Sequence, residues 1–197
     1  MPTVTDVDGN VYHTVKIGTQ TWMVENLKTT HYRNGDAIPN EKNGQNWANL
    51  ATGAYVDYDN VPANGEVYGH LYNWFAATDA RNIAPQGWHV PSKAEYATLV
   101  DYLGGEAVAG IKLKEKGTQH WLSPNIGSNS SGFTALPSGY YSTNGNFYSL
   151  GSGFVVWTTT LEDLTFAREY QMFNSGDSFY DDILDKNTGV AIRCIKD

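Results

Sequence analysis

The sequence predicts an α+β protein made of antiparallel strands, two short helices and many turns. Short runs that alternate apolar and polar residues recur along the chain and are separated by turn residues. Only two segments show the apolar spacing of a helix. Glycine occupies 20 of the 197 positions, so turns are frequent. The chain is long enough to bury an ordinary core, and we expect a single domain over residues 1–197.

The N-terminal segment, residues 4–30, is expected to form strand, turn, strand, turn and strand. Asp8-Gly9 lies between two alternating runs, which is a strong hairpin signal, and Gly18 turns the chain into the next strand. Asp6 and Asp8 have the residue type of calcium ligands, but the remainder of an EF-hand loop does not follow. A turn is therefore the favoured interpretation of both aspartates.

Residues 34–67 are predicted to be irregular, because Gly, Pro, Asn and Asp recur too often for a long helix or strand. A loop of this length either carries function or covers the core, and the sequence leaves both open. The first helix is expected within residues 68–78, where Leu71, Trp74 and Phe75 share one face. His70 lies beside this face, and a structural role is favoured over ligand contact.

The second helix is specified by its own ends. Ser92 and Glu95 form a capping box, Pro91 prevents backward extension, and Gly104-Gly105 provide a left-handed stop. The apolar face consists of Tyr96, Leu99, Val100 and Leu103.

Short strands and loops are expected from Gly110 to Thr160, with a hairpin at residues 140–150 whose Asn144-Gly145 pair is typical of a type I′ turn. Residues 166–197 predict two or three antiparallel strands. In the terminal strand, residues 189–195, Val190, Ile192 and Cys194 alternate, so Cys194 is expected to be buried.

Composition excludes several functions. The formal net charge of −8 disfavours nucleic acid or an anionic membrane as the main partner. No apolar run is long enough for a membrane span, and the first ten residues contain no export signal. Because Cys194 is the only cysteine, an internal disulfide, a cysteine zinc cluster and a redox pair are excluded.

Catalytic patterns are also missing. No G-x-S-x-G sequence is present, and the histidines lack the i, i+4 spacing of a helical metal site; they are His13, His31, His70, His89 and His120. We therefore expect neither an enzyme nor a bound cofactor or metal. Acidic residues gather near the C-terminus, and a solvated acidic face is favoured for them. A calcium site, a basic ligand and a glycosidase carboxylate pair stay as alternatives; the residues are Glu162, Asp163, Asp177, Asp181, Asp182 and Asp185.

Aromatic residues interleaved with small polar ones dominate residues 140–180, a composition typical of antibody binding loops. Phe154, Trp157 and Phe166 are favoured as core residues of alternating strands. The ligand face is expected mainly within residues 138–187. Its candidate ligand-binding residues are Tyr148, Trp157, Leu161, Asp163, Arg168, Tyr170, Asn174, Asp177, Phe179, Tyr180 and Asp181. Both alternating sets of residues 166–184 contain apolar side chains, so the sequence does not fix which set faces outward.

Six stretches carry a family resemblance over nearly the whole chain. They are, in chain order, DVDGNVYHTVKIGTQTWMVENLKTTHYRNGDAIP, YGHLYNWFAA, APQGWHVPSKAEYATLVDYLGG, GFTALPSGYY, VVWTTT and GVAIRCIKD. With these stretches in this order, the sequence resembles the Fibrobacter succinogenes major paralogous domain, a family of bacterial surface and secreted proteins. WHVPSKAEY and GVAIRCI are also similar to motifs of formylglycine-generating enzyme relatives, which share a C-type lectin-like fold. The resemblance implies that fold, with terminal strands tied together and a loop-rich ligand face.

The resemblances also bear on activity. Formylglycine generation needs a pair of active-site cysteines, and the lone Cys194 does not supply one. Calcium-dependent sugar binding in C-type lectins uses the tripeptides Glu-Pro-Asn or Gln-Pro-Asp with Trp-Asn-Asp, which are missing here. The C-terminal part is similar to the variable proteins of diversity-generating retroelements, although one sequence does not reveal variation.

Together these observations favour a non-enzymatic receptor-binding or adhesion protein that binds a protein or glycan ligand on another cell or particle. We expect it outside the cell, on a cell surface or on a virion. A structural or assembly component is the alternative, and the oligomeric state stays open.

Overall fold

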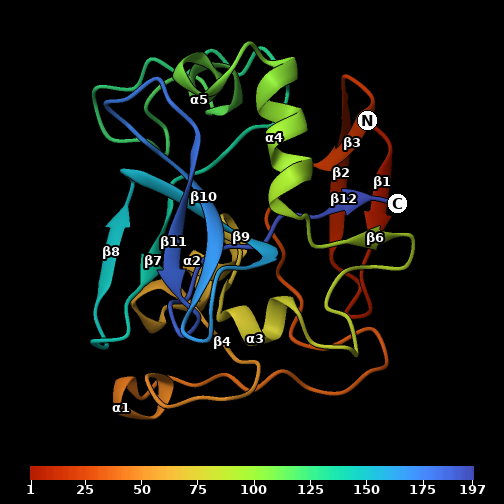
Figure 1. The fold of residues 1–197 in the computed structure, drawn as a ribbon, viewed down its shortest axis with the longest axis vertical. Helices are drawn as coiled ribbons and strands as arrows, with labels where there is room; N and C mark the ends of the chain where they lie inside the picture. Colours follow the sequence, from red (N-terminus) through yellow and green to blue (C-terminus); the bar gives the residue numbers. More distant parts are fainter.

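The computed structural model describes all 197 residues and has the predicted α+β composition (Figure 1). Its strands are β1 (Thr3–Thr5), β2 (Val11–Ile17), β3 (Gln20–Met23), β4 (Tyr55–Val56), β5 (Leu71–Tyr72), β6 (Trp88–His89), β7 (Ser138–Tyr141), β8 (Phe147–Leu150), β9 (Gly153–Leu161), β10 (Phe166–Phe173), β11 (Tyr180–Asp185) and β12 (Ile195–Lys196). Its helices are α1 (Gly44–Trp47), α2 (Pro62–Tyr68), α3 (Trp74–Ala77), α4 (Lys93–Tyr102) and α5 (Glu106–Leu113), with a 3-10 turn at Tyr58–Asn60. None of the helices has the length and apolar character needed to cross a membrane.

The N- and C-terminal strands share one sheet. Its strand order is β1-β2-β3-β12-β6, and every neighbouring pair is antiparallel. The predicted turns are confirmed, since Gly9 and Gly18 have φ of 87° and 61°, a backbone region that favours glycine. Both chain ends therefore lie on the same side of the molecule (Figure 1).

A second sheet is built from the C-terminal part of the chain. Its order is β11-β10-β9, so the long strand β10 lies in the middle and pairs antiparallel on both sides. Two further antiparallel pairs complete the strands: β4 pairs with β5, and β7 and β8 form a hairpin. The prediction of antiparallel strands in this part of the chain is confirmed.

The β7–β8 turn differs in type from the prediction. A type I′ turn needs positive φ at both central residues, but only Gly145 has it, with φ of 81°. The amide of Gly145 donates to the carbonyl of Ser142, and the amide of Ser142 donates to the carbonyl of Asn146. The hairpin therefore closes with a longer loop in which glycine alone takes the left-handed position.

Local helix signals are confirmed only where the residues themselves specify both ends. Ser92 and Glu95 form the predicted capping box of α4, and Gly104 and Gly105 have φ of 102° and 97°. Around residue 71 the predicted helix is shorter, because Leu71 and Tyr72 pair as β5 and only Trp74–Ala77 is helical. The expectation of two helices is wrong: α5 was predicted as loop and strand, and α1 and α2 interrupt the irregular region.

Two hydrophobic clusters meet at one extended segment, residues 190–195. Val190, Ile192 and Cys194 belong to one cluster, whereas Ala191 and Ile195 belong to the other. Strand β9 divides in the same way, with Val155 and Trp157 on one side and Phe154 and Val156 on the other. The period of two in an extended chain explains how one segment can serve two cores. The predicted burial of Cys194 is confirmed.

Within this segment, Arg193 is completely buried. Its Nε and Nη2 donate to the Asn26 side-chain oxygen at 3.0 and 2.8 Å, and Nη1 donates to the Phe133 carbonyl at 2.5 Å. The guanidinium also lies over the Phe133 ring at 4.4 Å. Burial lowers the pKa of Arg193 to about 10, so the group stays charged at neutral pH.

Replacing Arg193 with Met should destabilise the protein by about 2–4 kcal/mol, because buried acceptors on Asn26 and Phe133 lose their donors. Urea unfolding measures this loss. Arg81→Met is the matched control, since Arg81 is 40% exposed and pairs with Asp79 at the surface, where such pairs contribute at most about 1 kcal/mol. Equal effects of the two substitutions would contradict the role given to Arg193.

Candidate functional site

The predicted ligand face maps onto β8, the β9–β10–β11 sheet and its turns, but its residues do not form one surface. Exposed positions are Tyr148, at 39%, Leu161, at 52%, Asp163 and Asp177. Partly exposed positions are Arg168, Asn174, Tyr180 and Asp181. The remaining three, Trp157, Tyr170 and Phe179, are at most 2% exposed. Placing these three aromatics on a ligand surface was therefore wrong.

The three aromatics are buried because both faces of this part of the sheet are covered by other elements. Tyr170 points toward α4, where its ring lies 5.0 Å from Tyr96, and Phe179 packs 5.0 Å from Tyr170. The indole of Trp157 donates instead to the Tyr72 carbonyl in the other cluster, at 2.8 Å. The core assignment of Phe154 and Trp157 is confirmed, whereas Phe166, predicted as core, is 36% exposed.

The exposed part of the sheet is its β9–β10 end. We name it the tip surface; it comprises Leu161–Phe166. On the edge strand β11, Asp182 and Ile183 are also exposed, and as consecutive strand residues they point to opposite faces. Leu164 is 96% exposed and Ile183 is 41% exposed. The sequence analysis missed Leu164, Phe166 and Ile183 as surface residues, because an apolar residue in a strand-rich region is normally assigned to the core.

Ion pairs connect the β9–β10 turn and the strands β10 and β11 to the start of α4. Arg168 donates through Nε to Glu162 at 2.6 Å and through Nη1 to Asp181 at 2.9 Å. The Lys93 ammonium, at the start of α4, lies 2.6 Å from the same Asp181 carboxylate. These contacts hold Arg168 in place within the protein and connect β10, β11 and α4.

The opposite end of the sheet is held by α5, the helix that the sequence analysis missed. Lys114 is buried, and its ammonium donates to the carbonyls of Phe173, at 2.9 Å, and Gly176, at 2.5 Å. Burial lowers the pKa of Lys114. A side chain at Gly110 would lie 2.5 Å from the Asp177 carbonyl, so only glycine lets the helix approach this loop. Lys114 and the close approach of α5 at Gly110 therefore hold the β10–β11 loop, which contains Asn174 and Asp177, in place.

Glu169 is an unusual residue in the middle of β10. It is completely buried, and neither carboxyl oxygen has a hydrogen-bond partner. Its neighbour Arg168 turns to the opposite side of the strand, and Asp182 stands across from it on β11. Burial, together with the negative charges of Asp182 and Asp181, raises the pKa of Glu169 well above its ordinary value of 4.5.

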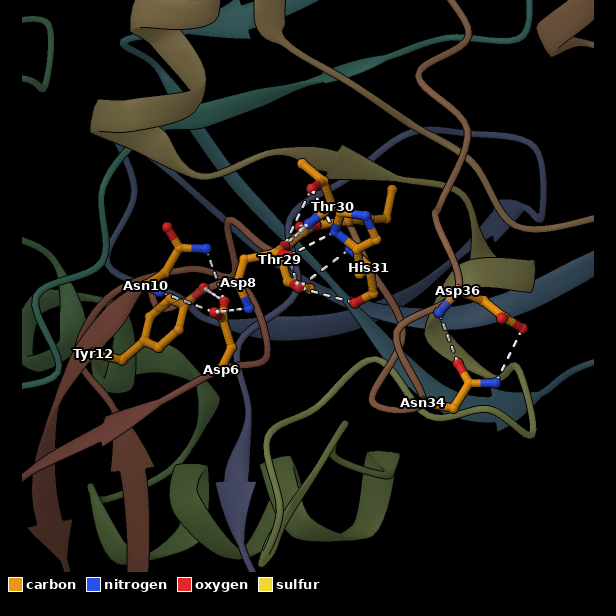
Figure 2. A network of polar contacts seen from close by, with 10 residues as sticks. Asp6, Asp8, Asn10, Tyr12, Thr29, Thr30, His31, Asn34 and Asp36 are labelled. Carbon is orange, nitrogen blue, oxygen red and sulfur yellow. Dashed lines mark hydrogen bonds and ion pairs between the residues drawn. The ribbon is translucent and has the colours of Figure 1, made fainter.

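The two aspartates of the first turn are saturated by donors (Figure 2). Asp6 accepts from the amides of Asp8 and Asn10, from the Asn10 side chain and, at 2.6 Å, from the Tyr12 hydroxyl. Asp8 accepts from Thr29 and from Thr30, and it pairs with His31 at 2.6 Å. Partial burial opposes ionisation of Asp8, but these hydrogen bonds hold its pKa below the ordinary value. The carboxylates thus tie the turn to residues 29–31, which agrees with the turn interpretation.

Each histidine pairs with a carboxylate. The pairs are His13–Glu25, His31–Asp8, His70–Asp57, His89 with Glu95 and Asp197, and His120–Glu115. The structural role predicted for His70 is supported by its 2.7 Å contact with Asp57. No three histidine, cysteine or acidic side chains come together as ligands for a metal ion.

None of the candidate ligand-binding residues lines any of the five main pockets. The most enclosed of these pockets, about 190 Å³, lies between residues 24–28 and 66–69, and Arg193 forms part of its wall. Another of these pockets, about 280 Å³, is lined in part by Leu164, Thr165 and Asp185 at the end of the β9–β10–β11 sheet. The exposed candidate residues themselves lie on open surface, which suits a macromolecular partner better than a small molecule.

The arrangement described so far defines an α+β protein with several antiparallel sheets, short helices and a terminal strand shared with the N-terminal sheet. The family model of the Fibrobacter succinogenes major domain matches residues 15–196, and the chain belongs to this family. No curated protein and no solved structure matches the chain.

Glu169 predicts a specific pH dependence of stability. Because its pKa is raised in the folded state, the folded protein keeps a proton that the unfolded chain releases above about pH 4.5. The stability contributed by protonated Glu169 is fully present below this value and falls as the pH rises toward the folded pKa. The variant Glu169→Gln stays neutral, so its stability advantage over the wild type should grow across this range.

Urea unfolding at a series of pH values measures this advantage. Glu66→Gln is the control, since the Glu66 side chain is 76% exposed and its replacement should leave the pH profile unchanged. A constant difference between wild type and Glu169→Gln at all pH values would rule out a buried neutral Glu169.

Proposed function

We propose that this protein is a non-enzymatic ligand-binding protein of the receptor-binding or adhesion type, displayed on a cell surface or a virion. Its ligand is a macromolecule, a protein or a glycan, on another cell or particle. The tip surface is the proposed contact region; Tyr148 on β8 and Asp177 in the β10–β11 loop are exposed elsewhere on the molecule. We further propose that the fold is C-type lectin-like, which is supported by the shared terminal sheet and by the loop-rich remainder of the chain.

The observation that carries this proposal is the contrast between a buried frame and an exposed end. All residues from Leu161 to Phe166 are exposed, and Leu164 is 96% exposed. Phe154, Trp157 and Met172 on the same two strands are completely buried. Apolar side chains gathered on an exposed turn above a rigid frame are typical of interaction surfaces. Two acidic residues that make no ion pair, Asp163 and Asp182, favour a partner with basic groups.

The alternative function, a structural or assembly component, is favoured by the same exposed apolar residues. In that case Leu164, Phe166 and Ile183 would be covered by neighbouring chains. Monomers rarely leave large apolar patches uncovered, so solution size distinguishes the two functions.

If the contact region is diversified, natural variation should follow the exposure pattern. Sequencing the 3′ end of the gene across its natural population should place substitutions in the codons of Leu161–Phe166, Asp182 and Ile183. The codons of Trp157, Tyr170 and Phe179 should be unchanged, because their side chains are buried. Adenines at the variable positions of a nearby copy of the segment would identify a retroelement. Uniform codons in the tip surface would contradict diversification, and substitutions concentrated at the buried codons would contradict the proposed contact region.

Sedimentation velocity at low micromolar concentration should show a monomer for the wild type and for Leu164→Asp. The control is Val11→Asp, since Val11 is 53% exposed on the other sheet. A wild-type oligomer that dissociates on Leu164→Asp but not on Val11→Asp would establish assembly and overturn the binding proposal.

A further inference from the structure

Figure 1 shows α1 beside the turn that joins β7 and β8. Between these two segments lies a broad cleft of about 830 Å³ that is wide open to solvent. The two walls touch through glycines: a side chain at Gly44 would lie 2.7 Å from the Gly145 backbone. Only glycine at both positions permits this contact between the two segments.

Both walls are anchored in the core, so the cleft is preformed. Trp47 on α1 is completely buried, and its ring lies 5.1 Å from that of Tyr141 at the end of β7. The Trp47 indole donates to the Asn187 carbonyl, and the Asn187 amide returns a hydrogen bond of 3.0 Å to the Trp47 carbonyl. A ligand would therefore find both walls already ordered, which lowers the entropic cost of binding.

The chemistry of the lining is almost entirely neutral and polar. On a chain of formal net charge −8, Lys42 is the one charged residue of the cleft, and Ala48 is the one apolar residue. The other lining residues are amides, a hydroxyl and glycines, namely Asn43, Gly44, Gln45, Asn49, Thr143, Asn144 and Gly145. A peptide would find no apolar pocket for its side chains, and a polyanion would find a single lysine.

The amides offer hydrogen-bond donors and acceptors in mixed order. The Asn43 oxygen accepts from the amides of Gln45 and Asn46, at 2.9 and 3.1 Å, which leaves the Asn43 NH₂ as a donor. The Asn49 NH₂ donates to the Gln45 carbonyl at 2.7 Å, which leaves the Asn49 oxygen as an acceptor. The exposed Gln45 side chain supplies both kinds of group. Adjacent hydroxyl groups of a sugar each donate and accept, so they match this set.

An aromatic side chain stands next to the cleft. The Asn144 amide donates to the Tyr148 hydroxyl at 2.9 Å, and the Tyr148 ring, 39% exposed, stacks on Tyr140 with centroids 5.4 Å apart. The hydrogen bond and the stacking thus order the Tyr148 ring beside the polar lining. The ring offers apolar contact area to a ligand that extends beyond the amide side chains of the cleft.

From these observations we propose that the cleft between α1 and the β7–β8 turn is a binding site for neutral oligosaccharides. Ala48 and Asn49 of the cleft also line a pocket with Leu164 and Thr165 of the tip surface, so variants of both regions are compared in the same assay. The proposed site requires neither a metal ion nor a charged sugar.

The test uses the full chain on a printed array of short gluco-, manno-, xylo- and galacto-oligosaccharides, with sulfated and sialylated glycans beside them. Binding should be confined to neutral glycans, and titration calorimetry with the strongest binder should give its Kd. The double variant Gln45→Ala/Thr143→Ala, which removes a polar side chain from each wall, should weaken this binding about 10-fold or more. Gln45→Trp, which places a bulky ring in the cleft, should weaken it further.

Gln119→Ala and Leu164→Ala are the controls, since Gln119 is an exposed amide outside the cleft and Leu164 belongs to the tip surface. Both should bind the glycan like the wild type, and thermal unfolding checks that all variants are folded. The proposal is overturned if no neutral glycan binds, if only sulfated or sialylated glycans bind, or if both cleft variants bind normally. Loss of glycan binding on Leu164→Ala alone would move the glycan site to the tip surface and leave the proposed function intact.

Discussion

The structure depends on the way residues 189–195 pass between the two hydrophobic clusters. The backbone of this segment bonds to four separate strands: Gly189 to β7, Val190 to β5, Ala191 to β9 and Cys194 to β3. Its side chains alternate between the clusters, and Arg193 adds three hydrogen bonds to buried acceptors. Because each cluster is completed only by this segment, the N-terminal sheet and the C-terminal sheet are stabilised together.

This frame separates buried and exposed positions along β9 and β10. In the part of β9 and β10 that packs against α4, both faces of the strands are covered, and even the carboxyl of Glu169 is desolvated. A buried carboxyl without a partner costs free energy whether it is neutral or charged. Beyond the enclosed part, the strands extend into the exposed turn of the tip surface. Substitutions there touch few neighbours, so the surface can change while the frame keeps its stability.

Local signals in the sequence were sufficient for the α4 capping box and for the turn at Asp8-Gly9, because the interacting groups are a few residues apart. Local signals failed for α5. Its N-cap residue, Gly105, has no side chain to cap the helix, and glycine is needed at position 110 because the β10–β11 loop lies too close for a larger residue. Local signals failed again for Tyr170, Phe179 and Phe166. Which residues of a strand are buried depends on the elements that pack against its two faces and on where that cover ends, and these elements, α4 among them, are distant in sequence.

The two proposed binding regions differ in chemistry although the same C-terminal segment supports both. The tip surface is apolar and acidic, whereas the cleft is neutral and lined by amides. Asn187 anchors α1 beside the cleft, and Lys186 donates to the Leu164 carbonyl, at 2.9 Å, beneath the tip. Adjacent residues thus fix both regions to a buried backbone. The two regions lie side by side, because Ala48 and Asn49 of the cleft line one pocket with Leu164 and Thr165 of the tip surface, so a large ligand at one would lie close to the other.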